Sequence, residues 1–300
     1  MLIDAASLWY RAYYALPSSI KSPEGARSGA VRGFFDGLST LVRRFSPTEL
    51  VCCLEGNWRP RWRTGLVAGY KADRAREDGS EDTPEGLDAQ VAAIEALLAA
   101  LGVATASHPD FEADDVIATL AARTAEPVCV VTGDRDLFQL VDDERDRTVV
   151  YLARGISKAE LFDGEAVATK FGVAPEHYAD FAVLRGDPSD GLPGVPGIGA
   201  KTATSLVNAY GGVNGVLAAA LDESSDLPAR RRRAILDAAD YLDRALKVTT
   251  VVDHVEVPLI ESGLPSEAAD PAAVETLTAQ WGIASAMRRF GEALTEARRA

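Results

Sequence analysis

The 300-residue sequence has little of several features that carry function in other protein classes. It contains three cysteines, of which Cys52 and Cys53 are adjacent, and their spacing matches no metal-binding pattern. We therefore expect reduced core cysteines in a cytoplasmic protein. No apolar run reaches about 18 residues, and no basic leader with an apolar segment opens the chain, so we expect no association with a membrane.

Positive charge is also scarce, with 31 Lys and Arg against 45 Asp and Glu and a net charge of −14. This balance argues against a nucleic-acid partner. The charges are segregated along the chain, however, and net charge is then a poor guide. The stretch from Trp58 to Arg76 is basic and contains a single acid, Asp73. Residues 77–82 have no apolar side chain, so we expect a mobile loop there.

Two clusters of acids lie beside apolar segments. One cluster begins a predicted helix, because apolar residues recur after it at helical spacing; it comprises Glu112, Asp114 and Asp115. The other follows a strand-like apolar run at residues 128–132 and comprises Asp134 and Asp136. Two charges about 4 Å apart repel by roughly 4 kcal/mol at an effective dielectric of about 20, and a hard divalent cation removes that cost. Taken alone, each cluster is as compatible with a structural role as with a metal site. In the structural role, Asp114 caps the helix, and Asp134 and Asp136 are solvated turn residues.

Two more predicted strands end on an acid, at Asp4 and Glu55. Strands that alternate with helices predict a mostly parallel sheet with helices on both faces. The carboxyl ends of parallel strands meet at one edge, where ligands of such sheets bind. Acids at three strand ends and one helix start therefore favour a metal site over solvation.

The remaining pattern predicts further helices and short strands. We expect helices at 31–45 and 83–101, strands at 103–106 and 148–152, and a short strand within 248–257. After about residue 164 the chain is expected to be mostly helical.

Five motifs occur in order between residue 1 and about residue 250. They lie at residues 2–4 (LID), 70–74 (YKADR), 112–115 (EADD), 132–136 (TGDRD) and 184–202 (LRGDPSDGLPGVPGIGAKT). In this order and spacing the sequence resembles the 5′ nuclease family, which comprises flap endonucleases and the 5′→3′ exonuclease domain of bacterial DNA polymerase I.

The resemblance implies an α/β fold with a central, mostly parallel sheet flanked by helices, of the PIN-like nuclease type. We place this core at residues 1–163, before the pattern turns mostly helical, and the resemblance adds a helical arch at about 58–84. A helical region at 164–290 would contain a helix–three-turn–helix element for DNA binding at about 184–210. After about residue 290 no room is left for a polymerase domain, so we expect a stand-alone nuclease or an excised domain.

The resemblance also implies two or more Mg²⁺ or Mn²⁺ ions. The residues that match the first ligand cluster are Asp4, Glu112, Asp114 and Asp115. Those that match the second are Asp134, Asp136 and Asp187, with Asp190 nearby. Two positions depart from the family pattern: Glu55 stands where the family usually has Asp, and Gly191 where it often has Asn. The longer Glu55 side chain can alter the metal geometry, and Gly191 can soften the turn that positions Asp187 and Asp190.

DNA contacts are expected from two basic or glycine-rich motifs. Lys71 and Arg74 lie one helical turn apart and would contact the scissile phosphate as catalytic residues, with Arg63 and Tyr70 as further DNA contacts. The glycines at residues 194–199 let a backbone approach a phosphate at the start of a helix. The expected contacts in this hairpin, which the resemblance pairs with a bound K⁺ ion, are Gly197, Gly199, Lys201 and Thr202.

The expected function is a metal-dependent, structure-specific 5′ nuclease, a flap endonuclease and 5′→3′ exonuclease, using two metal ions in DNA replication and repair. Expected partners are 5′ flaps, nicked or gapped duplexes and free 5′ ends, with RNA primer strands as a further candidate, and we expect a monomer. Two other functions stay open at this point: a catalytically weak structure-specific DNA-binding protein, and a small-molecule phosphatase. The basic segment and the glycine hairpin argue against the phosphatase, because a small substrate needs neither.

Overall fold

The computed structural model describes residues 1–258 and 261–300 and contains one six-stranded sheet. The strands are β1 (Leu2–Asp4), β2 (Val51–Cys53), β3 (Ala104–Ala106), β4 (Val128–Thr132), β5 (Arg147–Tyr151) and β6 (Glu160–Phe162). Each strand is short, and β1 and β2 are buried along their whole length. Their order in the sheet is β3-β2-β1-β4-β5-β6, and every neighbouring pair is parallel except β5 with β6. The predicted mostly parallel sheet is thus confirmed.

The strand order reverses direction between β1 and β4. From β1 the chain builds outward through β2 to β3, and then returns to place β4 on the other side of β1. In open parallel sheets a crevice forms at such a reversal, beyond the carboxyl ends of the strands. Asp4 ends β1, and Asp134 and Asp136 follow β4, so these acids lie on either side of that crevice.

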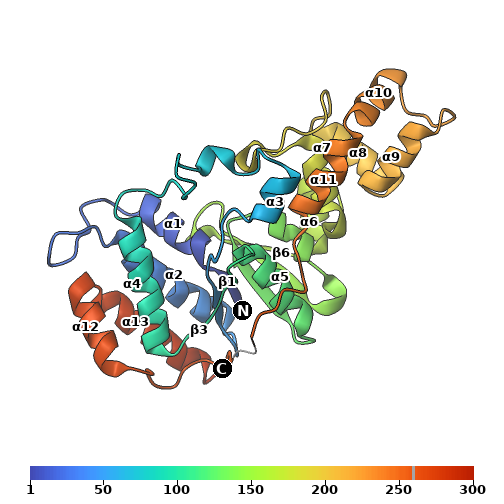
Figure 1. Cartoon of the computed structure of the whole chain (residues 1–300). Coiled ribbons are helices and arrows are strands. Elements are labelled where there is room, and N and C mark those ends of the chain that lie inside the picture. Colours follow the sequence, from blue (N-terminus) through green and yellow to red (C-terminus); the bar gives the residue numbers. More distant parts are fainter. Residues whose placement is uncertain (259–260) are drawn as a thin grey trace.

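Helices cover both faces of the sheet and form a separate group beyond it (Figure 1). The helices up to residue 123 are α1 (Ala5–Ala15), α2 (Gly29–Phe45), α3 (Arg61–Leu66), α4 (Leu87–Leu101) and α5 (Ala113–Arg123). Those after β6 are α6 (Gly164–Phe171), α7 (Tyr178–Arg185), α8 (Ala200–Tyr210), α9 (Val213–Leu221), α10 (Ala229–Asp237), α11 (Ala239–Thr249), α12 (Pro271–Trp281) and α13 (Ala284–Ala297). Short 3₁₀ turns include η1 (Ala72–Arg74), η2 (Asp136–Leu140) and η6 (Pro188–Asp190).

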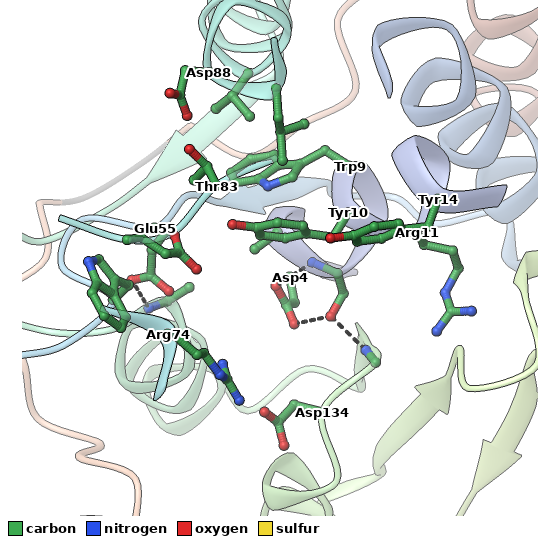
Figure 2. Close-up of a pocket in the computed structure, with 18 of the residues that line it drawn as sticks. Asp4, Trp9, Tyr10, Arg11, Tyr14, Glu55, Arg74, Thr83, Asp88 and Asp134 are labelled. Atoms are coloured by element: carbon green, nitrogen blue, oxygen red, sulfur yellow. Dashed lines mark hydrogen bonds between the residues drawn. The ribbon is translucent and has the colours of Figure 1, made fainter. Parts of the chain in front are cut away.

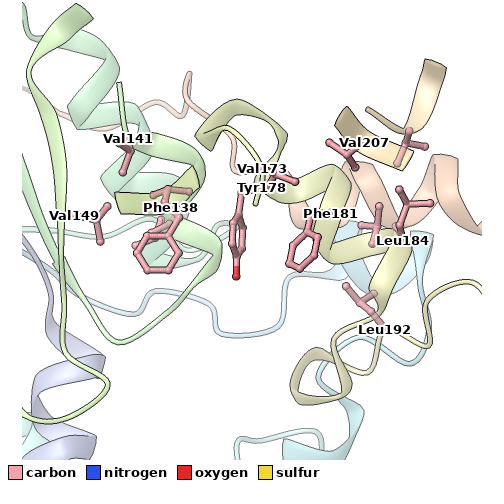
Figure 3. Packing of buried hydrophobic residues seen from close by; sticks show 14 of the residues in the cluster. Phe138, Val141, Val149, Val173, Tyr178, Phe181, Leu184, Leu192 and Val207 are labelled. Carbon is pink, nitrogen blue, oxygen red and sulfur yellow. The ribbon is translucent and has the colours of Figure 1, made fainter. Parts of the chain in front are cut away.

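Alternation along the strands separates two hydrophobic cores. Leu2 and Val130 face the core under α5, whereas Ile3 and Val131 face the core under α2, α4 and α13. This is the period of two that a strand imposes on its side chains. The first core continues into the helical group, where Phe138 of η2 packs against Tyr178 of α7 with ring centroids 5.5 Å apart (Figure 3). The turn that carries Asp134 and Asp136 is therefore anchored to the helical group.

The last two helices return to the sheet. Helices α12 and α13 lie beside α2 and α4, at the opposite end of the molecule from α9 and α10 (Figure 1). Phe290 of α13 packs on Phe35 of α2, with ring centroids 5.6 Å apart. The residues after 270, part of which the sequence placed with the helical region, thus contribute to the core of the α/β part.

Two predicted elements differ from the structure. The helix expected from residue 83 begins at Leu87, because Gly86 adopts a left-handed conformation (φ 71°) that a helix cannot continue through. The strand expected within 248–257 is absent from that described segment, because α11 runs to Thr249 and side chains satisfy the backbone beyond it. Gln139 accepts from the N–H of Val251, and Thr119 from that of Val255.

Within the two described ranges, no helix is both long enough and apolar enough to cross a membrane.

Candidate active site

A cavity of about 880 Å³ opens at the crevice between β1 and β4. Its lining includes four of the predicted acids and both predicted catalytic cations: Asp4, Glu55, Asp114, Asp134, Lys71 and Arg74. Figure 2 shows that Asp4, Glu55, Asp134 and the guanidinium of Arg74 face the same open space. The structure therefore brings together residues that lie up to 130 positions apart in the sequence.

Asp4 is fixed by the start of α1. It is the N-cap of that helix and accepts a hydrogen bond from the Ser7 N–H at 3.1 Å. The Ser7 hydroxyl donates to Asp4 at 2.5 Å, and the Thr132 hydroxyl donates to it at 2.7 Å across the β1–β4 boundary. The carboxylate of Asp4 thus has one defined orientation at the floor of the cavity.

The turn after β4 positions the second pair of acids. The N–H of Asp134 donates to the Thr132 hydroxyl at 2.9 Å, and the N–H of Asp136 donates to the Asp134 carboxylate at 2.8 Å. Thr132 therefore contacts both Asp4 and the backbone of Asp134. This single hydroxyl thus helps to orient acids that follow two adjacent strands.

Glu55 reaches the start of α5. Its carboxylate accepts from the N–H of Ala113 at 3.2 Å, a helix-terminal donor that has no partner within the helix. Burial raises the pKa of Glu55 to about 8. Among the smaller effects, the positive charge of Lys71 lowers this pKa and the negative charge of Glu112 raises it. Glu55 thus links the segment after β2 to the start of α5.

The prediction that Asp115 binds metal and that Arg63 binds DNA is not supported by their positions. Arg63 is 2% exposed and donates to both oxygens of the fully buried Asp115, at 2.7 and 2.8 Å. The same guanidinium donates to the carbonyl of Val248 at 2.9 Å. Since Asp115 also accepts from the N–H of Val252 at 2.8 Å, its oxygens are occupied by protein donors. These two residues form a buried ion pair that joins α3, α5 and the end of α11.

Tyr70 was likewise expected to contact DNA, but it is 4% exposed and its hydroxyl donates to Glu112 at 3.0 Å. Glu112 is also buried, and it lies 3.1 Å from Arg63 and 3.0 Å from the Lys71 ammonium. Among the described residues, Glu112 Oε1 has no hydrogen-bond donor, because the approach of Lys71 is that of an ion pair without hydrogen-bond geometry. This oxygen retains capacity for a further cation.

Lys71 is held beside the acids rather than in solvent. Burial alone would lower the pKa of its ammonium, but the charge of Glu112, with smaller contributions from Tyr70 and Asp190, raises the pKa well above the ordinary value. Lys71 and Arg74 were expected on one helical face; they lie at the two ends of a single 3₁₀ turn, η1, and both line the cavity.

The turn at residues 187–191 carries the last two predicted ligands. Asp187 is the N-cap of η6, and its carboxylate is 3.1 Å from Arg185 and 3.3 Å from Arg135. Asp190 is 7% exposed and accepts from Arg74 at 3.0 Å. Both acids are thus paired with arginines near the second cluster.

The acids influence one another's protonation. Burial raises the pKa of Asp4, Asp114 and Asp136 above the usual range of an aspartate, and burial raises that of Asp190 to about 6. The negative charge of Asp134 adds to the increase at all four. The charge of Asp134 therefore affects acids of both predicted clusters.

This donor set fits hard divalent cations. It consists of buried carboxylate oxygens that repel one another, and Glu112 Oε1 accepts no hydrogen bond from the described residues, although the Lys71 ammonium lies 3.0 Å away. In the described part of the chain, no three His, Cys, Asp or Glu side chains converge closely enough to hold one ion by themselves. Mg²⁺ is commonly bound by one or two carboxylates, with waters and substrate phosphates as its other ligands, so the spacing is compatible with such an ion.

The glycine-rich hairpin lies between α7 and α8, as predicted. Its backbone is pinned by Val195, whose N–H donates to Leu184 at 3.0 Å, and by Gly194, whose N–H donates to the Tyr241 hydroxyl at 3.0 Å. Gly197 (φ 81°) and Lys201 are exposed. Gly199 is the N-cap of α8, so the first N–H groups of this helix point toward solvent beside an exposed lysine.

Sequence reasoning missed the residues that orient the acids. Ser7 and Thr132 hold Asp4, but no pattern in the sequence relates two hydroxyls 125 positions apart. Arg11 lies one helical turn after Ser7 and also lines the cavity. The sequence did offer one signal for Ser7 and Arg11. Residues three and four apart share a helix face, so the spacing of Asp4, Ser7 and Arg11 places all three on the same side of α1.

The fold and the site bring together carboxylates that suit hard cations and basic side chains that suit a phosphate, which is the donor set that a nuclease requires. Two family models match the chain: "5′-3′ exonuclease, N-terminal resolvase-like domain" at residues 1–172 and "5′-3′ exonuclease, C-terminal SAM fold" at residues 173–272. The chain belongs to the 5′-3′ exonuclease family. The nuclease predicted from the five motifs is thereby confirmed.

Relatives of similar length support this assignment. A 5′-3′ exonuclease of Streptomyces coelicolor is 45% identical over 300 residues, which cover 98% of this chain and 100% of that protein. A 5′-3′ exonuclease of Mycobacterium tuberculosis is 42% identical over 309 residues, covering 98% and 97%. The bacteriophage T5 flap endonuclease, solved with DNA and metal ions, is 17% identical with a TM-score of 0.65 and covers 100% and 99%, which shows the shared fold.

Proposed function

We propose that this chain cleaves DNA phosphodiesters near 5′ ends, at flaps, nicks, gaps and free ends, in replication and repair. The observation that carries this proposal is the cavity in which Asp4, Asp114 and Asp134 meet Lys71 and Arg74. Acids that bind cations repel a phosphodiester, so a nuclease also needs basic groups directly beside them. The cavity supplies both.

We propose as ligands of two or more Mg²⁺ or Mn²⁺ ions the acids that face the cavity or the adjoining turn. These are Asp4, Glu55, Glu112, Asp114, Asp134, Asp136, Asp187 and Asp190. When bound, divalent ions acidify the attacking water and stabilise charge on the leaving oxygen. The chain's own contribution is orientation: Ser7 and Thr132 fix Asp4, and Ala113 fixes Glu55.

Lys71 and Arg74 would hold the scissile phosphate. The ammonium of Lys71 lies 3.0 Å from Glu112, so a phosphate bound to it would lie beside the acids. Arg74 is partly exposed, and its Nη2 atom already donates to Asp190 and to the Ser189 carbonyl, both at 3.0 Å. Its planar guanidinium has further donors for a phosphate.

The hairpin would grip the duplex away from the cut. We propose that Gly197, Gly199, Lys201 and Thr202 contact backbone phosphates, with a K⁺ ion on the hairpin carbonyls. Backbone N–H groups at a helix start bind phosphate without reading bases, so this grip would be independent of sequence. RNA primer strands as substrates, a monomeric state, a cytoplasmic location and the division into core and helical region belong to the same proposal.

A catalytically weak DNA-binding protein is the competing function, because Glu55 and Gly191 depart from the family pattern. One assay separates them: incubate the protein with a 5′-labelled flap, a nicked duplex and a single strand, in Mg²⁺, Mn²⁺ or EDTA. Release of label from the flap that requires the metal supports the nuclease. Retention of the flap without release in any metal would refute it, and hydrolysis of small phosphate esters alone would indicate a phosphatase.

A further inference from the structure

The basic segment touches the acidic turn through two glycines. Gly191 has a left-handed backbone (φ 71°), and a Cβ atom built on it would lie 2.0 Å from the carbonyl oxygen of Gly69 and 2.9 Å from its carbon. The same Cβ atom would be 3.6 Å from the backbone nitrogen of Lys71. Because the obstructing atoms belong to the backbone, no rotamer change relieves the contact. Any side chain at residue 191 must therefore push apart the turn at 187–191 and the segment that leads into Lys71.

Lys71 itself has an unusual backbone. It adopts a left-handed conformation (φ 49°, ψ 26°), which is unfavourable for a residue with a Cβ and tends to occur where function requires it. Its N–H donates to the Asp190 carbonyl at 3.0 Å, immediately before Gly191. Its ammonium is 3.0 Å from Glu112. The turn therefore holds the backbone of Lys71, and the acid holds its tip.

We propose that Gly191 is a positioning residue for Lys71. Its lack of a side chain allows the turn at 187–191 to lie against Gly69, and this contact fixes where the Lys71 ammonium enters the cavity. The inference rests on the proposed function, since it assigns Lys71 to the scissile phosphate. It gives the glycine at this position a specific role, whereas the sequence indicated only a departure from the family pattern that can soften the turn.

The chain offers a matched control for the backbone strain. Gly211, at the end of α8, has nearly the same conformation (φ 73°), and a Cβ built there meets nothing within 4 Å. Gly211→Ala therefore imposes the same left-handed strain as Gly191→Ala without the collision. A difference between the two variants isolates the close approach to Gly69.

The test measures single-turnover cleavage of a 5′ flap in Mg²⁺ and flap affinity in EDTA, for Gly191→Ala, Gly211→Ala, Lys71→Ala and the double variant Gly191→Ala/Lys71→Ala. Circular dichroism and thermal unfolding confirm that each is folded. We expect Gly191→Ala to cleave about 10- to 100-fold more slowly, because a misplacement of about 1 Å can cost that much. Affinity should change less than about 3-fold, and Gly211→Ala should cleave at the wild-type rate.

Coupling to Lys71 distinguishes positioning from a general structural role. In the Lys71→Ala background, adding Gly191→Ala should cost less than about 3-fold, because residues that act as one unit are not additive. Full additivity, or equal losses for Gly191→Ala and Gly211→Ala, would overturn the inference. A wild-type protein that does not cleave the flap would instead overturn the proposed function, so the two failures are distinguishable. If Gly191→Ala fails to fold, Gly191→Asn and Gly211→Asn measured at a lower temperature replace the two alanine variants, with the same criteria, because asparagine carries the same Cβ but tolerates a left-handed backbone better than alanine.

Discussion

The buried ion pair of Arg63 and Asp115 makes a sharp prediction about stability. Arg63→Met removes a guanidinium that contacts both oxygens of Asp115 at 2.7 and 2.8 Å and lies 3.1 Å from Glu112. Both carboxylates are buried, so solvent cannot replace the lost cation. Leaving a buried charge without its partner costs about 3–5 kcal/mol. At roughly 2–4 °C per kcal/mol for a chain of this size, the unfolding temperature should fall by about 6–20 °C.

The assay is urea unfolding of three variants beside the wild type. Arg61→Met makes the same substitution two residues earlier on α3, at an exposed position, and should change the free energy of unfolding by less than about 0.5 kcal/mol. The double variant Arg63→Met/Asp115→Asn removes both charges, keeps an oxygen that can accept the N–H of Val252, and should recover part of the loss, because Asp115 no longer leaves a buried charge unpaired. A single variant within about 1 kcal/mol of wild type would refute the reasoning, as would a double variant less stable than the single one.

Four further predictions concern catalysis, protonation, the core and DNA affinity. Lys71→Ala should lose about 100-fold or more of the flap cleavage rate while binding DNA in EDTA, and a full rate would contradict its role. Without divalent ions, unfolding temperature should fall between pH 5.5 and 8: burial raises the pKa of Asp190 to about 6 and of Glu55 to about 8, so the folded protein keeps protons that the unfolded chain, with pKa values of about 4, has released. An unfolding temperature in EDTA that is higher at pH 8 than at pH 5.5 would show that these acids do not dominate the pH dependence of stability. Phe138→Ala, at a fully buried ring, should cost about 3–5 kcal/mol in urea unfolding, and a loss below about 1 kcal/mol would contradict the assigned packing. Lys201→Ala should weaken duplex binding and reduce the slope of log affinity against log salt by about 1, and an unchanged slope would exclude a phosphate contact.

The sheet and the meeting of the acids were predictable because both depend on local patterns. Strands β1, β2 and β4 include short apolar runs, and the alternation of strands and helices implies a parallel sheet. Parallel strands then place Asp4, Glu55 and Asp134 at one edge whatever the details of the loops. For the same reason the helix start at Glu112 was predictable from the apolar spacing that follows it.

The partners of individual side chains were not predictable. Arg63 lies in a basic stretch that reads as exposed, yet it pairs with an acid 52 positions away and with a carbonyl 185 positions away. Such pairing depends on tertiary packing, which local periodicity does not encode. The same holds for the return of α13 to α2, and for the irregular segment after Thr249, whose N–H groups find side-chain acceptors in place of a neighbouring strand.

The central claim is that acids from separate strands hold cations around Asp134 for phosphodiester cleavage. Its most direct test is Asp134→Asn, which preserves shape and removes one charge, measured for single-turnover flap cleavage in Mg²⁺ and for flap affinity in EDTA. The account predicts a loss of about 100-fold or more in cleavage with affinity retained or increased. Cleavage at the wild-type rate, or wild-type cleavage that persists in EDTA, would contradict it.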